Sequence, residues 1–411
     1  MKHLRHVKSI AISITHQNSS VQLLDVTVIG AGPAGLSTAY ELKKAGLIPL
    51  VLERTPAVGD VWRNHYDGLR LNTGRFFSAL PGSVFPRSAG AWPARDEVVR
   101  LLETFPAQGD FIVQTGIDIE KVNYDHDRDI WLATSSNGNQ FKSRAVVMAI
   151  GTCRIPKIPE WEGRETFPGK IIHSSTFKRA QDYVGKRVLV IGSGNSAAEI
   201  ACRLTEYANS VTMSIRTPPY ILPKSICGIP FVGWGIWLKH LPNNLIDMLL
   251  SLVQRRMIGD LTAYGLPFPS MPLTEQYATN NVVPILYGPF AGNVRSARIK
   301  IVGPIQKISG RAVHVLRAVG VTRNDDNAMI TLEPEVIVAG TGFRTGIPEL
   351  VQIPNITDEK GRPEISGDQG FDGAPRLYFI GQINPLSGQL REIRIEAGKI
   401  AKRIRRQLGT K

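Results

Sequence analysis

Cysteine is scarce in this sequence. Cys153, Cys202 and Cys227 are the only cysteines in 411 residues, and no two of them form a C-x-x-C pair. A disulfide framework or a zinc ribbon needs more cysteines at closer spacing, so both are excluded and a reducing, cytoplasmic compartment is favoured. The histidines show no ligand spacing apart from His3 and His6 near the N-terminus, and we predict no metal site.

Long hydrophobic runs are also absent. The longest apolar stretch, residues 226–238, has 13 residues and contains Pro230 and three glycines. A membrane span needs about 18 apolar residues, so we predict no integral membrane span and interpret this stretch as a pocket or surface-docking segment. Residues 1–24 lack a clear apolar run followed by a small-residue cleavage site, which argues against a signal peptide. We expect a disordered N-terminal extension there.

Acidic residues are missing from both ends of the chain. The formal net charge is +14, of which residues 1–24 contribute three Lys or Arg and residues 398–411 contribute six, in each case without an acid. Most of the excess charge is therefore terminal. The mildly basic body suits anionic small molecules and argues against a nucleic-acid partner. We interpret the C-terminal cluster as a solvated tail, with a membrane or nucleic-acid patch as the alternative.

Two units, each of strand, glycine loop and helix, organise what is present. In the first unit, residues 26–29 predict a strand, a helix follows and stops at Gly46, and residues 50–52 predict a second strand that ends at Glu53. The loop reads G-x-G-x-x-G and contains Gly30, Gly32, Pro33, Ala34 and Gly35. Its glycines let a pyrophosphate approach the backbone, the helix N-terminus attracts the negative charge, and the acid accepts hydrogen bonds from ribose hydroxyls. This unit therefore predicts dinucleotide binding.

The second unit repeats the pattern but ends on the opposite charge. A strand over residues 186–191 leads into a glycine loop and a helix, and a strand over residues 211–215 ends at Arg216. The loop contains Gly192, Gly194, Asn195 and Ser196. A guanidinium pairs with a 2′-phosphate, which a carboxylate would repel, so this unit favours NADPH over NADH. The alternative role of Arg216 is a surface salt bridge.

A simple dehydrogenase needs one nucleotide-binding fold, whereas this sequence contains two. The pair predicts FAD in the first fold and NADPH in the second. Residues 335–339 and 377–380 are interpreted as strands that return to the first fold. We therefore predict an α/β protein with two Rossmann-like dinucleotide-binding domains, the second inserted in the first. The predicted FAD domain comprises residues 25–160 and 326–411, and the predicted NADPH domain comprises residues 161–325 with a substrate-pocket insert at about residues 220–285.

Several further motifs are shared with a known family. They are Phe167-x-Gly169-x-x-x-His173-x-x-x-Phe177, Leu52-Glu53-Arg54, Trp62-Arg63, residues 66–72, Trp92-Pro93, residues 221–224 and residues 264–267. Together they resemble the class B flavin-dependent monooxygenases, and most of all the YUCCA-type indole-3-pyruvate monooxygenases. The resemblance covers roughly residues 24–400. Phe177 departs from the family, which has Tyr or Trp at that position.

The resemblance also implies roles for single residues. Arg54, Trp62, Arg63 and Leu71 would lie at the flavin, and Asn72 would face its reactive ring as the catalytic residue. Asn72 is alternatively a turn-forming residue.

Two later motifs add cofactor contacts by the same resemblance. Gly342 closes a motif where the chain crosses between domains, and Gly381 ends the last strand of the first fold. The family often has an acid after that glycine, where this chain has Gln382, so a contact there would be neutral. His173 is a linker position in the family.

The activity that the resemblance implies is that of an FAD- and NADPH-dependent monooxygenase. Such an enzyme activates O2 as a C4a-(hydro)peroxyflavin and inserts one oxygen atom into a small organic substrate. The specific reaction that the resemblance suggests is oxidative decarboxylation of an aromatic 2-oxo acid such as indole-3-pyruvate. N- or S-hydroxylation and Baeyer–Villiger oxidation would use the same scaffold. Rivals of another class are an NADPH-dependent flavin or disulfide reductase, against which the absence of C-x-x-C argues, and a redox-sensing flavoprotein. The sequence does not predict an oligomeric state.

Overall fold

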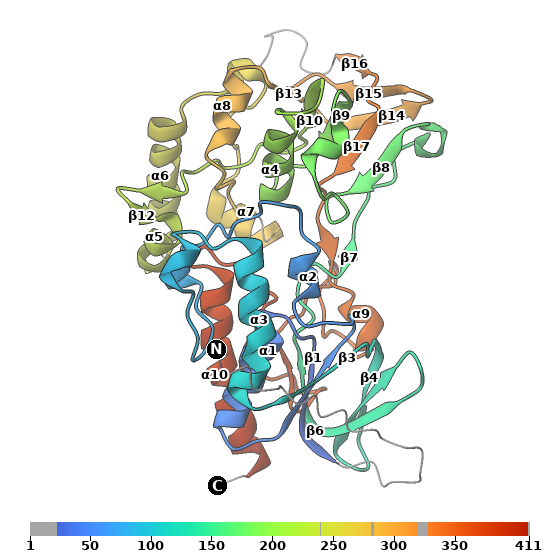
Figure 1. Cartoon of the computed structure of the whole chain (residues 1–411), viewed down its shortest axis with the longest axis vertical. Coiled ribbons are helices and arrows are strands. Elements are labelled where there is room, and N and C mark those ends of the chain that lie inside the picture. The colour runs from blue at the N-terminus through green and yellow to red at the C-terminus, as the bar shows by residue number, and fades with distance from the viewer. Residues whose placement is uncertain (1–22, 239, 281–282, 319–327, 410–411) are drawn as a thin grey trace, which may run out of the picture.

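The computed structural model describes residues 23–238, 240–280, 283–318 and 328–409. Two sheets lie one above the other along the longest axis of the molecule (Figure 1). The predicted extension of residues 1–24 falls outside the described residues except for Leu23 and Leu24, and Leu24 already begins the first strand.

The lower sheet contains the strands of the first glycine-loop unit. Its order is β3-β2-β1-β6-β5-β4, and β19 also pairs with β6. Its strands are β1 (Leu24–Ile29), β2 (Pro49–Glu53), β3 (Ile112–Thr115), β4 (Ile119–Asp125), β5 (Ile130–Ser135), β6 (Gln140–Met148) and β19 (Leu377–Phe379). β1, β2, β3, β6 and β19 are parallel, whereas β4 and β5 are antiparallel additions at one edge.

Alternation of side chains gives the lower sheet two buried faces. Val26 and Val28 enter a core with the helices α1 (Pro33–Lys44), α3 (Arg95–Gly109) and α10 (Gln389–Leu408). Ile29 and its neighbours in β2 and β6 enter a second core with α9 (Ile347–Leu350). A parallel sheet that is covered on both faces is the arrangement expected for a dinucleotide-binding fold.

The upper sheet contains the second unit and is parallel throughout, in the order β13-β10-β9-β17-β8. Its strands are β8 (Lys170–His173), β9 (Arg187–Ile191), β10 (Ser210–Ser214), β13 (Ile299–Val302) and β17 (Val336–Ala339). The helices α4 (Asn195–Leu204) and α8 (Pro289–Arg295) share one core with it. The antiparallel strands β14 (Ile305–Ser309), β15 (Ala312–Leu316) and β16 (Met329–Leu332) cover the other face.

The position of β17 corrects one prediction. Residues 335–339 were expected to return to the first fold, but Val336–Ala339 pairs with β8 and β9 in the upper sheet. A short β-branched strand buried on both faces has the same pattern in either sheet, so its composition did not indicate its partners. The chain therefore returns to the lower sheet after Ala339, later than the predicted boundary at residue 326, whereas the second run, at β19, does lie in the lower sheet.

The predicted insert is mostly helical. It contains β11 (Ser225–Ile226), β12 (Ile229–Pro230), α5 (Phe231–Leu238), α6 (Asn243–Val253), the π-helical turn η5 (Gln254–Ile258), η6 (Thr262–Tyr264) and α7 (Leu273–Asn280). The remaining short elements are α2 (Asp60–Arg63), η1 (Arg75–Phe77), η2 (Arg87–Ala89), η3 (Arg164–Thr166), η4 (Ala180–Tyr183), β7 (Ile155–Pro156) and β18 (Phe343–Arg344). No helix in the described part of the chain is both long and apolar enough to cross a bilayer.

The C-terminal basic cluster corrects a second prediction. Its residues up to Leu408 are part of α10, which packs along α1 and is not a solvated tail. Ile393, Ala397, Ile400 and Ile404 recur every three or four residues and form the buried stripe of this helix. The charges occupy the opposite face, so the run of like charge concealed an amphipathic helix.

Candidate cofactor-binding cleft

The first glycine loop is shaped by close backbone contacts. Gly30 has φ of +106°, and a Cβ there would lie 2.6 Å from the carbonyl oxygen of Ala149. A Cβ on Gly35 would lie 1.8 Å from the carbonyl oxygen of Gly30. A Cβ on Gly32 would meet nothing within 4 Å, and the first turn of α1 holds no acid. The loop is therefore closed toward the sheet and open on the side where a helix N-terminus attracts a phosphate.

Glu53 lies at the end of β2 and fixes the same loop. Its Oε2 accepts a hydrogen bond from the Ala31 amide at 2.7 Å, and its Oε1 accepts from the amide and the hydroxyl of Thr55, each at 2.9 Å. Its Oε2, which accepts one hydrogen bond, retains a lone pair for a further donor. Glu53 can thus both hold the loop and accept from a ribose hydroxyl.

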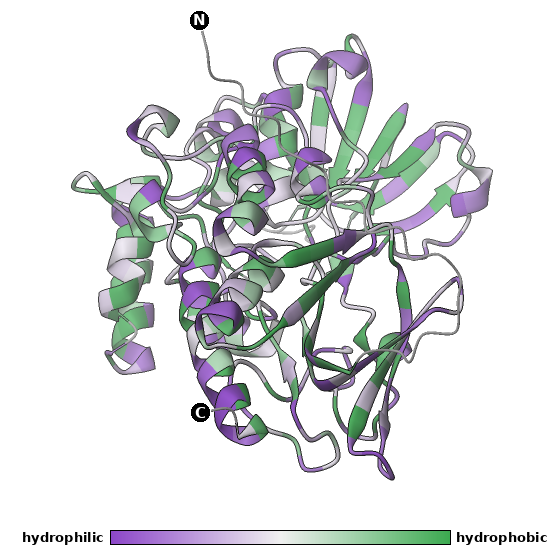
Figure 2. Cartoon of the chain, turned by 60° about the horizontal axis from the view of Figure 1, so that its bottom comes forward, coloured by the Kyte–Doolittle hydropathy of each residue, from purple (hydrophilic) through white to green (hydrophobic). Residues whose placement is uncertain are grey.

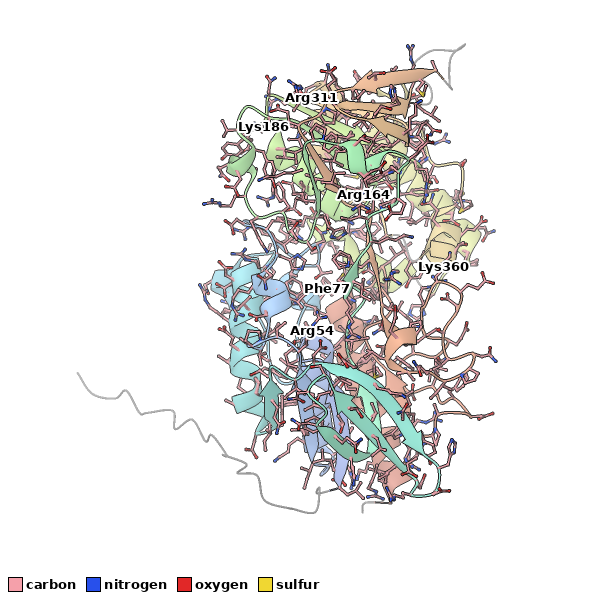
Figure 3. The ribbon with its side chains drawn as sticks, turned by 90° about the vertical axis from the view of Figure 1, so that its right-hand side faces the viewer. Arg54, Phe77, Arg164, Lys186, Arg311 and Lys360 are labelled. Atoms are coloured by element: carbon pink, nitrogen blue, oxygen red, sulfur yellow. The ribbon has the colours of Figure 1, made fainter. Side chains whose placement is uncertain are left out.

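A cleft of about 310 Å³ opens at this edge of the lower sheet. Of the predicted cofactor-binding residues, those that line it are Gly30, Gly32, Pro33, Ala34, Glu53, Arg54, Trp62 and Gly381. Figure 3 shows Arg54 at the end of the lower sheet that faces the upper one. The carboxyl ends of parallel strands and the following loops are where open α/β sheets bind ligands.

Two predicted flavin neighbours do not line the cleft. Arg63 forms ion pairs with Asp60 and with Glu103 on α3, which occupy its guanidinium. Leu71 is buried in the core that α1, α3 and α10 share. The family motif indicated the right segment, but a motif does not show which of two neighbouring side chains faces a ligand.

The cleft contains a cationic group that no motif indicated. Arg154 lines it together with Arg54, and its guanidinium lies 3.8 Å from Asp118. Burial and the neighbouring charge of Arg54 lower the pKa of Arg154. Two guanidiniums that share one partly buried edge favour an anionic ligand there.

No motif indicated His65, whereas Gln382 was expected to make a neutral contact at most. His65 lines the cleft, and its burial, with the charges of Lys178 and Arg95, lowers its pKa to about 4. Gln382 is buried, and neither its Oε1 nor its Nε2 has a partner among the described residues. A buried amide without partners is costly unless a further group satisfies it. The position directly after Gly381 is the sequence signal for Gln382. The residues of the neighbouring cleft fit an FAD molecule, whose polar groups would satisfy this amide.

Asn72 lies beside the cleft and does not line it. The side chain is half-buried and makes no hydrogen bond within the described part of the chain. Its neighbour Thr73 lies 3.2 Å from the position that a Cβ on Gly388 would take, just before the lining residue Gln389. The amide is therefore free to meet a ligand.

The second glycine loop has the same construction. Gly192 has φ of +127°, and a Cβ there would lie 2.2 Å from the carbonyl oxygen of Gly340. Gly194 caps α4, whose first turn holds no acid, and Ser196 is exposed. Arg216 is exposed at the end of β10 and forms no ion pair among the described residues. This loop can therefore receive a second dinucleotide, with Arg216 available for a 2′-phosphate.

Both polar atoms of the Asn195 side chain form hydrogen bonds to backbone groups. Its Nδ2 donates to the carbonyl of Pro284 at 2.9 Å, and its Oδ1 accepts from the Leu286 amide at 2.8 Å. It positions residues 284–286 against the loop, a role that the motif did not indicate.

His173 and Gly342 meet where the chain crosses between the sheets. The His173 Nε2 donates to the carbonyl of Gly342 at 2.9 Å, and the Lys157 amide donates to the same carbonyl at 3.0 Å. Because Nε2 carries the proton, Nδ1 accepts from Ser175. Burial lowers the pKa of His173, which keeps the ring neutral. In this structure both residues stabilise the place where the chain crosses between the sheets, and Gly342 does not line the cleft.

A buried network joins the two sheets directly. The Tyr66 hydroxyl donates to Glu199 Oε2 at 2.9 Å, and Arg203 Nη2 donates to Glu199 Oε1 and to the carbonyl of Gly68, each at 2.7 Å. Glu199 is only 4% exposed. Since Tyr66 and Gly68 follow α2 and Glu199 and Arg203 lie on α4, the network fixes the loop of one unit to the helix of the other.

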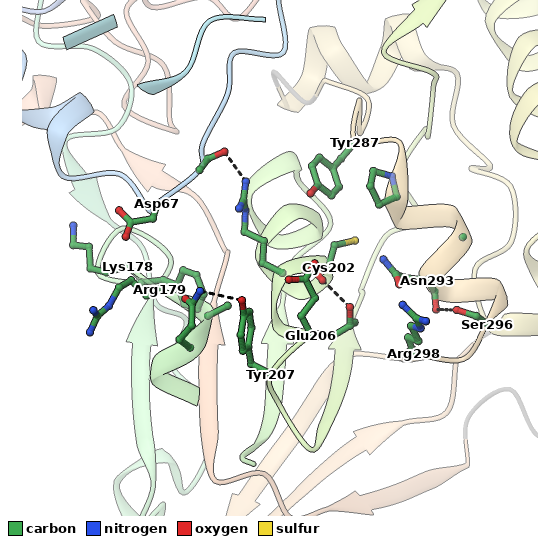
Figure 4. A pocket seen from close by; sticks show the side chains of 18 residues that line it. Asp67, Lys178, Arg179, Cys202, Glu206, Tyr207, Tyr287, Asn293, Ser296 and Arg298 are labelled. Carbon is green, nitrogen blue, oxygen red and sulfur yellow. Dashed lines mark hydrogen bonds between the residues drawn. The ribbon is translucent and has the colours of Figure 1, made fainter. Parts of the chain in front are cut away.

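Beside this network lies a second, polar cavity of about 670 Å³ (Figure 4). Tyr207, Tyr287, Asn293 and Arg298 surround it. It adjoins the C-terminal half of α4, whereas the glycine loop is at the N-terminal end, so the cavity belongs to neither nucleotide loop.

Comparison with known proteins agrees with this geometry. The family model described as pyridine nucleotide-disulphide oxidoreductase matches residues 27–223. A probable indole-3-pyruvate monooxygenase, YUCCA3 of Arabidopsis thaliana, is 29% identical over 364 residues, which cover 86% of this chain and 81% of that protein. The curated relatives that the chain matches are indole-3-pyruvate monooxygenases, and the chain is similar to them over most of its length.

Solved structures share the fold of this chain. A flavin-containing monooxygenase from Stenotrophomonas maltophilia superposes with a TM-score of 0.66 at 21% identity, covering 93% of this chain and 99% of the other. Cyclohexanone monooxygenase from Rhodococcus sp. Phi1, bound to NADP+, gives a TM-score of 0.70 at 18% identity, covering 95% and 86%. The NADP+ in that structure is the kind of ligand that the second glycine loop of this chain is predicted to bind.

Proposed function

We propose that this monooxygenase oxidatively decarboxylates an aromatic 2-oxo acid of the indole-3-pyruvate type. In that reaction the 2-oxo acid, O2, NADPH and a proton give the carboxylic acid shortened by one carbon, CO2, water and NADP+. NADPH supplies two electrons, one oxygen atom enters the acid, and the other leaves as water. FAD, when bound, supplies the hydride-accepting and oxygen-activating chemistry.

The observation that carries the proposal is an ammonium group without a carboxylate partner. The Lys224 Nζ lies 5.2 Å from the centre of the Trp92 ring, and Lys224 forms no ion pair among the described residues. Burial lowers the pKa of Lys224. A half-buried cation above an aromatic ring suits a ligand that has both a carboxylate and an aromatic group.

Backbone hydrogen bonds place this cation near the segment of Asn72. The Leu71 amide donates to the carbonyl of Pro93, and the Arg75 amide donates to the carbonyl of Ala91, each at 2.9 Å. The segment that carries Trp92 therefore runs beside residues 71–75. We assign Lys224 to the substrate carboxylate and Asn72 to hydrogen bonding at the reacting atoms.

The insert provides an apolar cover over the same place. On α5, Val232 lies 3.1 Å from the position of a Cβ on Gly388, and a Cβ on Gly235 would lie 2.6 Å from the carbonyl oxygen of Leu386. α5 therefore packs on the turn that precedes α10. This cover would exclude water from the reacting groups, which limits loss of the oxidising equivalent as hydrogen peroxide.

The test compares NADPH consumption, acid product and hydrogen peroxide for the purified holoenzyme with indole-3-pyruvate. We expect stoichiometric indole-3-acetate and little peroxide. Lys224→Met should raise the KM for the 2-oxo acid about tenfold or more, because a hydrogen bond to a charged group contributes about 1.5–3 kcal/mol. The KM for NADPH should stay unchanged.

Lys121→Met, on the exposed face of β4, is the matched control and should leave both KM values unchanged. A neutral thioether or ketone that is oxygenated with full coupling, while 2-oxo acids release only peroxide, would instead identify a heteroatom-hydroxylating or Baeyer–Villiger enzyme. Rapid NADPH oxidation to peroxide with every substrate would favour a reductase, and no substrate-stimulated consumption would favour a redox sensor.

A further inference from the structure

The insert carries an apolar surface that the proposed reaction does not use. α5 and α6 project from one side of the molecule, at the left in Figures 1 and 2. We call this surface the insert ridge and define it by Trp237, Leu241, Leu245, Met248, Leu252 and Met257. Trp237 is 78% exposed, and Met248 and Leu252 are each 60% exposed. Large apolar side chains that are exposed and close together in one segment usually mark a contact surface.

The ridge follows the periodicity of a helix. Leu245, Met248 and Leu252 are separated by three and four residues, which places them in one stripe along α6, and Leu241 lies just before the helix. The inward stripe of the same helix consists of Ile246 and Leu250, which pack in the core of the insert. Because that inward stripe already attaches α6 to the protein, the outward stripe has no packing role among the described residues.

The charges around the ridge have one sign. Residues 237–257 include Lys239, His240, Arg255 and Arg256 and a single acid, Asp247. The Asp247 carboxylate accepts hydrogen bonds from the amide and the hydroxyl of Thr274, at 3.0 and 2.5 Å. Arg256 is exposed and forms no ion pair in the described structure. Within residues 237–257 the exposed charged side chains are therefore cationic.

We propose that the insert ridge docks the enzyme on an anionic lipid surface. An exposed Trp, a stripe of Leu and Met, and flanking Arg are the features that place an amphipathic helix in the interfacial layer of a bilayer. Anionic headgroups complement the Arg side chains, and the apolar stripe enters the layer below them. A docking of this kind requires no membrane span.

The first experiment is co-sedimentation of the full-length holoenzyme with vesicles. Phosphatidylcholine vesicles with about 30 mol% phosphatidylserine are compared with phosphatidylcholine alone, each at low and high salt. We expect binding to the anionic vesicles that high salt weakens. Arg256→Gln should lower the partition coefficient about fivefold, since each cation near an anionic surface contributes about 1 kcal/mol.

The apolar stripe is tested with the double variant Trp237→Ser and Leu252→Ser, which should lower the partition coefficient at least about tenfold. The matched control is Ile48→Ser with Val184→Ser, two apolar residues that are similarly exposed, at 63% and 64%, but lie outside the insert. FAD content and NADPH consumption in solution should be unchanged in both double variants. Near-equal loss in the control would show that the binding is general apolar adsorption and would overturn the proposal.

Two other outcomes would also overturn it. One is failure of the native holoenzyme to bind the anionic vesicles at either salt concentration. The other is a concentration-dependent dimer, seen by light scattering, that the ridge double variant abolishes and vesicles do not displace, since the ridge would then be covered by a second copy of the chain.

Discussion

Gly32 and Gly35 stand three residues apart in one loop, yet an added methyl group would meet different surroundings. At Gly35 it would lie 1.8 Å from a backbone oxygen, whereas at Gly32 nothing lies within 4 Å. We expect Gly35→Ala to disturb packing of α1 and to yield little folded protein. Gly32→Ala should fold with an unchanged apoprotein melting temperature but bind FAD about tenfold more weakly, because the methyl group faces the ligand side. Thermal melts and FAD titrations separate the two; equal behaviour of both variants would contradict the geometry.

His65 predicts a pH dependence of stability. Its folded pKa of about 4 lies below the ordinary value of 6.5. The unfolded chain therefore binds more protons between these values, so the contribution is fully present above about pH 6.5 and is lost as pH falls toward 4, by up to about 3 kcal/mol. His65→Gln should lose less stability than the native enzyme between pH 7 and pH 4.5 in urea denaturation with FAD content monitored. The exposed His126→Gln should behave as native, and parallel pH profiles for His65→Gln and the native enzyme would refute the prediction.

Some single residues of the candidate site can be predicted from the sequence, and others cannot. Glu53 and the glycines of the first loop were predictable because each performs a task that few residue types can perform. Arg63 and Leu71 were not, because residues beside a motif can turn toward a core or a carboxylate without changing the motif. Arg154 enters the cleft through tertiary folding from a segment far from the glycine loop.

At the scale of elements, periodicity predicted the strands at both glycine loops to within a residue or two, but not every partner or every helix. β17 was assigned to the wrong sheet because pairing depends on long-range packing. α10 was not predicted, because its run of basic residues hides the apolar stripe that Ile400 and its neighbours form. Local patterns define elements, and burial decides where they pack.

The packing of α10 gives a direct prediction. Ile400 has no exposed surface, so Ile400→Ala leaves a cavity and should lower the free energy of unfolding by about 2–5 kcal/mol. Lys402→Ala, on the exposed side of the same helix, should change it by less than about 0.5 kcal/mol. Urea denaturation followed by far-UV circular dichroism measures both. A neutral Ile400→Ala would mean that the C-terminal segment is a tail after all.

At the scale of the whole molecule, two nucleotide loops are useful only if their ligands meet. The sequence predicted both loops and their nesting, but not how one unit is held against the other, because the contacts join residues more than a hundred positions apart. The structure supplies that link in Tyr66, Glu199 and Arg203. The Tyr66 hydroxyl stays protonated, since burial and the nearby Glu199 raise its pKa. The network therefore connects a neutral donor, a buried carboxylate and a guanidinium across the interface.

Tyr66→Phe removes one donor and leaves Glu199 Oε2 buried without it. Loosening of the interface should slow the reduction of FAD by NADPH about threefold to tenfold, because hydride transfer depends on the orientation of the two ligands. FAD content should not change. Anaerobic stopped-flow absorbance measures the rate, and Tyr207→Phe is the matched control, since its hydroxyl bonds only to Gln181 within the same unit. If Tyr66→Phe were reduced at the native rate while Tyr207→Phe were slowed, the orientation of the two units would depend on contacts other than this network.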